Sequence, residues 1–136
     1  MICAEHLELL LTFITSITYI TFITYVCAMP TAYLLKSCPY SFKLLLFISE
    51  AGLRDQFEIV TLEPESQAMK EAKQKIEKAT GEKASFPTVE IEPGVYKSDS
   101  DELIAHFSQK HGVDPANLIA LSFYKESIFP QLQKMH

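Results

Sequence analysis

The segment that decides the fold is AYLLKSCPYSFKLLLFISEAG, residues 32–52. Residues 32–37 form a short apolar run, which is typical of a buried strand. Pro39 suits the first position of a helix, where its missing N–H sacrifices no hydrogen bond. The apolar run that follows predicts a helix up to Gly52, a residue that readily adopts the left-handed cap conformation. This segment therefore predicts a strand followed directly by a helix, with a cysteine at the junction.

The next segments continue the same alternation. Residues 57–62, FEIVTL, predict a second strand, and residues 65–80 predict a surface helix with opposite charges at helical spacing. Residues 88–92, TVEIE, predict a strand that a turn at EPG joins to a short returning strand, VYK. Residues 99–111 predict a further helix that starts on acidic and hydroxyl residues. The order β-α-β-α-β-β-α predicts an α/β fold, in which helices cover both faces of a mixed four-stranded sheet.

A hydrophobic segment, residues 1–30, precedes this central domain of residues 31–113. Residues 9–29 carry no charge, and their number is that of a hydrophobic helix that crosses a bilayer. Glu5 and Glu8 lie before the segment and basic residues follow it, which predicts a single-pass membrane anchor with the C-terminal domain facing the cytosol. The alternatives are a buried or disordered N-terminal extension and a soluble cytoplasmic protein.

Residues 114–136 predict one extra helix with an apolar side. Leu118, Leu121, Ile128 and Leu132 need a partner that covers them. That partner is the central domain, a second copy of the chain in a homodimer, or a longer helical domain of which residues 114–136 are the start.

Composition argues against several functions. The net charge of the 136 residues is −5, and no basic stripe is present to bind nucleic acid. The histidines and cysteines show no ligand spacing, so no metal site is predicted. The three cysteines lack paired spacing, so a disulfide scaffold is not expected and a reducing compartment is the simpler assumption.

Cys38 is the candidate nucleophile. At the start of a helix, free backbone N–H groups and the positive end of the helix dipole stabilise a thiolate. Ser41 is the second candidate catalytic residue, because its hydroxyl can donate to that thiolate or to a ligand. A serine cannot resolve a mixed disulfide, so thiol–disulfide exchange here requires an external thiol. The alternatives are an inert, buried Cys38 and a Ser41 that only bonds the first helical turn.

Three motifs in this order resemble those of the thioredoxin-fold glutathione-binding domains, namely the glutaredoxins and the N-terminal domain of glutathione S-transferases. They are CPYS at 38–41, FPTVEI at 86–91 and SDSDELIAHF at 98–107. The resemblance covers residues 32–112 and implies a thioredoxin-like fold with Cys38 as the functional thiol. It also implies that Tyr40 helps to shape the sulfur site.

The resemblance further implies where glutathione binds. The bond between Phe86 and Pro87 is expected to be cis, and backbone groups of Thr88 or its neighbour are expected to pair with the tripeptide. The γ-glutamyl end is expected at three residues that open the last helix of the domain, Asp99, Ser100 and Asp101.

The implied activity is glutathione-dependent thiol–disulfide exchange through Cys38. Glutathione is then the co-substrate, and a small-molecule thiol or a glutathionylated protein is the partner. One alternative is conjugation of glutathione to an electrophile, which needs an apolar second site. Another is a non-catalytic module that binds glutathione or another protein.

Overall fold

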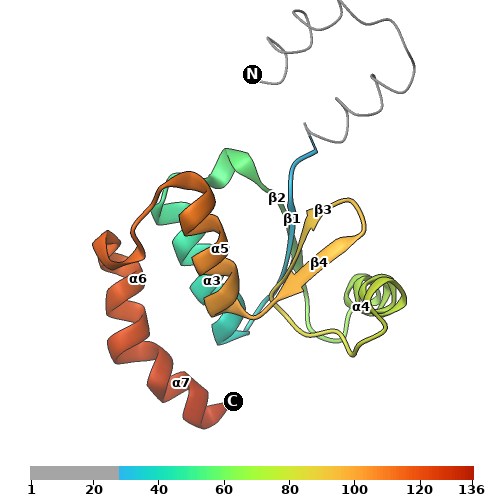
Figure 1. The fold of residues 1–136 in the computed structure, drawn as a ribbon. Helices are drawn as coiled ribbons and strands as arrows, with labels where there is room; N and C mark the ends of the chain where they lie inside the picture. The colour runs from blue at the N-terminus through green and yellow to red at the C-terminus, as the bar shows by residue number, and fades with distance from the viewer. Residues whose placement is uncertain (1–27) are drawn as a thin grey trace, which may run out of the picture.

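The computed structural model describes residues 28–136, which form a mixed α/β structure (Figure 1). Two strand–helix units are followed by a hairpin and a helix, in the order expected from the sequence. The elements are β1 (Thr31–Leu35), α3 (Pro39–Glu50), β2 (Glu58–Leu62), α4 (Gln67–Thr80), β3 (Thr88–Glu92), β4 (Val95–Ser98) and α5 (Ser100–His111).

The predicted membrane anchor lies outside the described residues, apart from its last residues, 28 and 29. Within residues 28–136, no helix has the length and apolar character that a membrane span requires.

The sheet has the order β2-β1-β3-β4, which confirms the predicted mixed four-stranded sheet. β1 pairs in parallel with β2, since α3 carries the chain across the sheet between them. β3 is antiparallel to both β1 and β4, and the β3–β4 register shifts between Glu90 and Glu92. This arrangement places the C-terminal end of β1 beside the loop that precedes β3.

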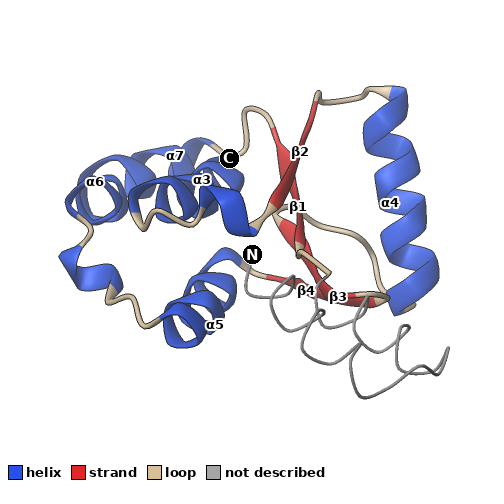
Figure 2. Ribbon diagram, turned by 90° about the horizontal axis from the view of Figure 1, so that it is seen from above, coloured by secondary structure: helices blue, strands red, loops and turns tan. Residues whose placement is uncertain are grey.

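Helices cover both faces of the sheet, as expected. α3 and α5 lie on one face and α4 lies on the other (Figure 2). Side chains of β1 contribute to the cores on both faces of the sheet, since neighbouring side chains of a strand point to opposite faces. Ala32 and Leu34 are buried with α3 and α5, whereas Tyr33 is buried with Ala72 and Ile76 of α4.

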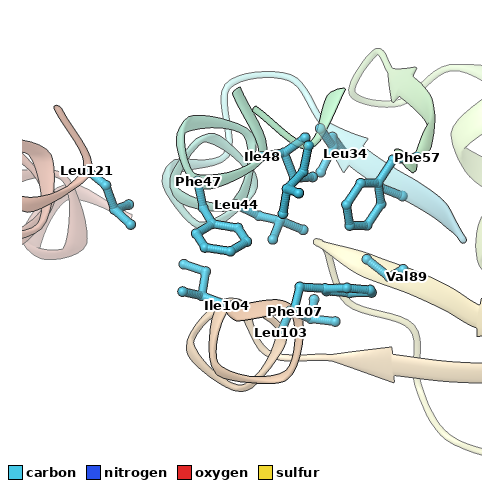
Figure 3. Packing of buried hydrophobic residues seen from close by; sticks show 12 residues of the cluster. Leu34, Leu44, Phe47, Ile48, Phe57, Val89, Leu103, Ile104, Phe107 and Leu121 are labelled. Atoms are coloured by element: carbon cyan, nitrogen blue, oxygen red, sulfur yellow. The ribbon is translucent and has the colours of Figure 1, made fainter. Parts of the chain in front are cut away.

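The larger core lies between the sheet, α3 and α5 (Figure 3). Leu44 and Phe47 of α3 are fully buried against Leu103 and Phe107 of α5. The Phe107 ring meets Phe57 edge-on with 4.7 Å between ring centroids. Burial of several large apolar side chains, each contributing about 1.5–3 kcal/mol, fixes α3 against the sheet and therefore fixes the position of its first residue.

The C-terminal helix begins later than the sequence predicts. A 3₁₀ turn over Pro115–Asn117 precedes α6 (Ile119–Phe123), which continues through a π-helical turn, Tyr124–Ile128, into α7 (Phe129–Met135). Pro130 explains the π-helical turn, because it has no N–H for a regular helical bond. In this turn, the Phe129 N–H donates to the carbonyl of Tyr124, five residues earlier.

This C-terminal segment packs on α3, on the side away from the sheet (Figure 1). Leu121 joins the larger core, and the Tyr124 hydroxyl donates to the Pro39 carbonyl over 2.7 Å. The Glu50 carboxylate accepts from the first free N–H groups of α6, at Ala120 over 2.9 Å and Leu121 over 3.0 Å. The central domain is therefore one partner of the apolar side, while Ile128 stays exposed and the homodimer stays a prediction.

Candidate functional site

Cys38 lies where β1 gives way to α3. Ser37 has a left-handed backbone with φ of 66°, which turns the chain out of the strand. Cys38 itself is extended and forms the N-cap of α3, with Pro39 at the first helical position as predicted. Its side chain is 7% exposed, and its thiol donates to the Phe86 carbonyl over 3.7 Å. The sulfur therefore lies between a helix start and the loop before β3.

The peptide bond between Phe86 and Pro87 is cis, which confirms the prediction made from the FPTVEI motif. Both strand registers of β3 begin at Thr88. Phe86 precedes this ladder, so the neighbouring strands do not pair with its backbone. The cis bond thus brings the Phe86 carbonyl to the thiol while Thr88 starts the strand.

The start of α5 forms the acidic side of the same region. Asp99 has a left-handed backbone with φ of 79°, and its carboxylate accepts from the N–H groups of Asp101 and Glu102 over 2.9 Å and 3.3 Å. Asp99 is therefore the N-cap of α5. Ser100 is buried, whereas the Asp101 side chain is 67% exposed and pairs with Lys43 over 2.9 Å.

A cleft of about 620 Å³, called the polar cleft below, brings these groups together. It contains seven of the nine predicted site residues, namely Cys38, Tyr40, Phe86, Pro87, Asp99, Ser100 and Asp101. Their side chains come from three segments far apart in sequence: the start of α3, the loop before β3 and the start of α5. The cleft therefore joins a thiol, a cis-proline loop and a carboxylate-lined helix start.

The other two predicted site residues, Ser41 and Thr88, do not line the polar cleft. The Ser41 hydroxyl is buried and accepts from the Leu35 N–H over 3.0 Å, which ties α3 to the end of β1. The Thr88 hydroxyl donates to the Ser85 carbonyl over 2.5 Å and shapes the loop before β3. Both hydroxyls thus bond to the backbone that positions the cleft.

A second cavity of about 470 Å³ also borders Cys38 and is called the apolar pocket below. Leu34, Leu45 and Leu132 contribute to its lining, together with Tyr124 and Cys38 itself. Burial raises the pKa of Tyr124 above its ordinary value of 10.0, and the nearby Cys38 adds to this effect through its negative form. No local sequence pattern indicates this pocket, because residues of α3 and α7 line it together.

Two lysines near the site, Lys36 and Lys43, differ in their ion-pair partners and in the cavity they adjoin. Lys36 forms an ion pair with Glu63 and lines the apolar pocket, not the polar cleft. Lys43 is 2% exposed and directs its ammonium at Asp101, a residue of the polar cleft. Sequence reasoning missed Lys43, although one cation inside the apolar run of α3 was a signal that the buried ammonium has a partner.

Among residues 28–136, no group of three or more His, Cys, Asp or Glu side chains is placed to hold a metal ion. Comparison with known protein families and with curated proteins finds no match to this chain. The observed fold and site define a mixed α/β protein with a cysteine at the N-cap position of a helix, beside a cis-proline loop.

Proposed function

We propose that this protein has a thioredoxin-like fold that binds glutathione in the polar cleft and catalyses thiol–disulfide exchange through Cys38. The supporting observation is the polar cleft itself, in which the Cys38 thiol lies 3.7 Å from the carbonyl before a cis proline and shares the space with an acidic helix start. Glutathione needs three such features: a sulfur site, a backbone edge and a site for its charged γ-glutamyl end.

Two parts of the tripeptide, its backbone and its γ-glutamyl ammonium, have complementary groups in the cleft. Phe86 lies outside the β3 ladder, so its backbone is positioned to pair with an extended peptide like an added strand. The Asp99 carboxylate already accepts from two N–H groups of α5. The exposed carboxylate of Asp101 is therefore the acceptor that receives the γ-glutamyl ammonium.

The exchange proceeds in two steps that balance. The Cys38 thiolate attacks the glutathione sulfur of a glutathionylated substrate, forming a Cys38–glutathione disulfide and releasing the substrate thiolate, which takes up a proton. The thiolate of a second glutathione then attacks the glutathione sulfur of that mixed disulfide. Oxidised glutathione leaves and the Cys38 thiolate is regenerated. In both steps the Cys38 sulfur lies at the N-cap of α3, at the positive end of the helix dipole.

The direct test is reduction of a glutathionylated peptide by the full chain with glutathione, coupled to glutathione reductase and NADPH oxidation. Cys38→Ser is expected to abolish the enzyme-dependent rate, while Cys3→Ser/Cys27→Ser is expected to keep it. Intact mass spectrometry of the double variant should show one glutathione per chain after incubation with oxidised glutathione. A Cys38→Ser variant as active as the parent would overturn the proposal.

Conjugation is the second candidate, because the apolar pocket offers the apolar site that this reaction needs beside Cys38. In that case the polar cleft activates the sulfur of glutathione itself, and an apolar electrophile occupies the pocket. Leu132→Ser should then slow conjugation of chlorodinitrobenzene and leave exchange on a small disulfide unchanged. If neither reaction is accelerated but glutathione binds, the non-catalytic module is the remaining reading.

Two predictions from the sequence stay proposals. Anchoring through residues 9–29 predicts that the full chain sediments with membranes and is released by detergent. A homodimer through residues 114–136 predicts a doubled mass by light scattering. Ile119 and Phe123, which are 81% and 63% exposed, are the residues whose replacement by Ser should abolish that dimer.

A further inference from the structure

Lys43 is the most deeply buried charged residue of the described chain. It lies in the middle of α3 with 2% of its side chain exposed, yet its carboxylate partner, Asp101, is 67% exposed at the polar cleft. The two atoms Nζ and Oδ1 are 2.9 Å apart. The ammonium therefore reaches from the interior to the rim of the cleft.

The same ammonium contacts the C-terminal helix. It lies 4.1 Å from the centroid of the Phe129 ring, the first residue of α7, and 5.8 Å from that of Tyr40. Phe129 and Tyr40 also meet edge-on with 5.1 Å between their centroids. Lys43 thus joins two residues of the polar cleft, Tyr40 and Asp101, to one residue of α7.

A buried ammonium depends on each of its partners. Removal of a cation from water is unfavourable unless a carboxylate, hydrogen bonds or an aromatic face compensate for the lost hydration. If Phe129 leaves its place, Lys43 loses the aromatic face and gains freedom to move toward solvent. The Asp101 carboxylate, held by that ammonium, then loses its fixed orientation.

We propose that Lys43 is a positioning residue that couples the packing of α7 on α3 to the orientation of Asp101, and so to recognition of the γ-glutamyl ammonium in the polar cleft. This inference rests on the proposed function for its ligand. According to this inference, the affinity for glutathione also depends on α7, a helix that does not form the acidic side of the polar cleft.

Calorimetric titration of the full chain with two ligands tests the coupling. One ligand is glutathione and the other is glutaryl-cysteinylglycine, which lacks only the γ-glutamyl ammonium. Lys43→Met is expected to weaken glutathione binding by about two- to fivefold, the range for an exposed ion pair, and to leave the analogue unchanged. Lys43→Arg should restore glutathione affinity. Lys75→Met is the matched control, because Lys75 pairs with Glu90 and neither residue lines the polar cleft.

Phe129→Leu keeps apolar volume and removes the aromatic face. It should weaken glutathione binding in the parent but add nothing in the Lys43→Met background. Additive effects, or an equal loss for both ligands in Lys43→Met, would overturn the coupling.

A readout without ligand separates this failure from failure of the proposed function. The Asp101 and Glu102 amide shifts, measured by NMR, should move on Phe129→Leu in the parent and stay in place in the Lys43→Met background. Equal shifts in both backgrounds overturn the coupling even if glutathione binds. If glutathione does not bind but the amide shifts move only in the parent background, the proposed ligand is wrong and the coupling through Lys43 stands.

Discussion

Removal of the Tyr124 hydroxyl tests how firmly the C-terminal segment is held on α3. Tyr124 is buried, and its hydroxyl donates to the carbonyl of Pro39, the first residue of α3, over 2.7 Å. A buried hydrogen bond contributes about 1 kcal/mol, and a carbonyl left without this donor adds a desolvation penalty. Tyr124→Phe is therefore expected to lower the free energy of unfolding by about 1 to 2 kcal/mol.

Urea unfolding of the full chain, followed by circular dichroism, measures this change. With a slope of about 1.5 kcal/mol per molar urea, the midpoint is expected to fall by about 0.7 to 1.3 M. Tyr40→Phe is the matched control, because it removes the same atom from a hydroxyl that only accepts a weak, exposed bond from Gln133 over 3.4 Å. Its expected loss is about 0.5 kcal/mol or less.

Equal losses in the two variants would refute the reasoning, since the buried bond would then add nothing over the exposed one. A changed slope in Tyr124→Phe would refute it as well. Such a change reports altered exposure on unfolding and not the loss of one bond.

Three further changes have defined outcomes. Phe47→Ala removes a fully buried ring between α3 and α5 and should lower the free energy of unfolding by about 3 to 5 kcal/mol in urea titrations. Glu50→Gln removes the charge facing the first N–H groups of α6, with an expected loss of about 0.5 to 1 kcal/mol and faster amide exchange there; unchanged exchange would contradict this role. Burial, assisted by nearby positive charges, lowers the pKa of His111 below its ordinary 6.5. The folded state therefore favours the neutral His111 ring. The stability that this neutral ring contributes is present above pH 6.5 and is lost as the pH falls through the pKa of His111 in the folded state. His111→Gln should flatten that fall in unfolding titrations between about pH 7 and pH 5, and an undiminished fall in the variant would count against it.

The strands and helices followed from local signals in the sequence. The predicted strands at 57–62 and 88–92 match β2 and β3 within one residue. Gly52, predicted to cap the helix that starts at Pro39, has the expected left-handed backbone with φ of 73° shortly after the end of α3. Such signals succeed because caps and periodic burial depend on residues within one or two turns of each other.

Most residues of the polar cleft were predicted from the sequence, but the direction in which each side chain points was not. The motifs located Cys38 and the cis Phe86–Pro87 bond, whereas Ser41 and Thr88 point to backbone groups outside the cleft. Which way a hydroxyl turns depends on the strand end or loop that offers it a partner. That partner is known only once the sheet register is known.

Contacts between distant segments escaped the sequence analysis for a related reason. Lys43 is paired with a carboxylate 58 residues later, and Glu50 accepts from an amide 70 residues later. Neither pairing leaves a periodic pattern in the chain. Lys43 stands out as the one cation in an apolar run, but only the tertiary structure identifies the partners of Lys43 and Glu50.

The position of Cys38 between the polar cleft and the apolar pocket has a consequence for how the thiol is assayed. We expect charged, water-soluble reagents to approach Cys38 through the cleft and neutral, apolar reagents to approach it through the pocket. A ligand seated in the cleft closes the first route and leaves the second open. Protection measured with iodoacetate and protection measured with an alkyl maleimide are therefore expected to disagree, because the two reagents approach this one sulfur from different cavities.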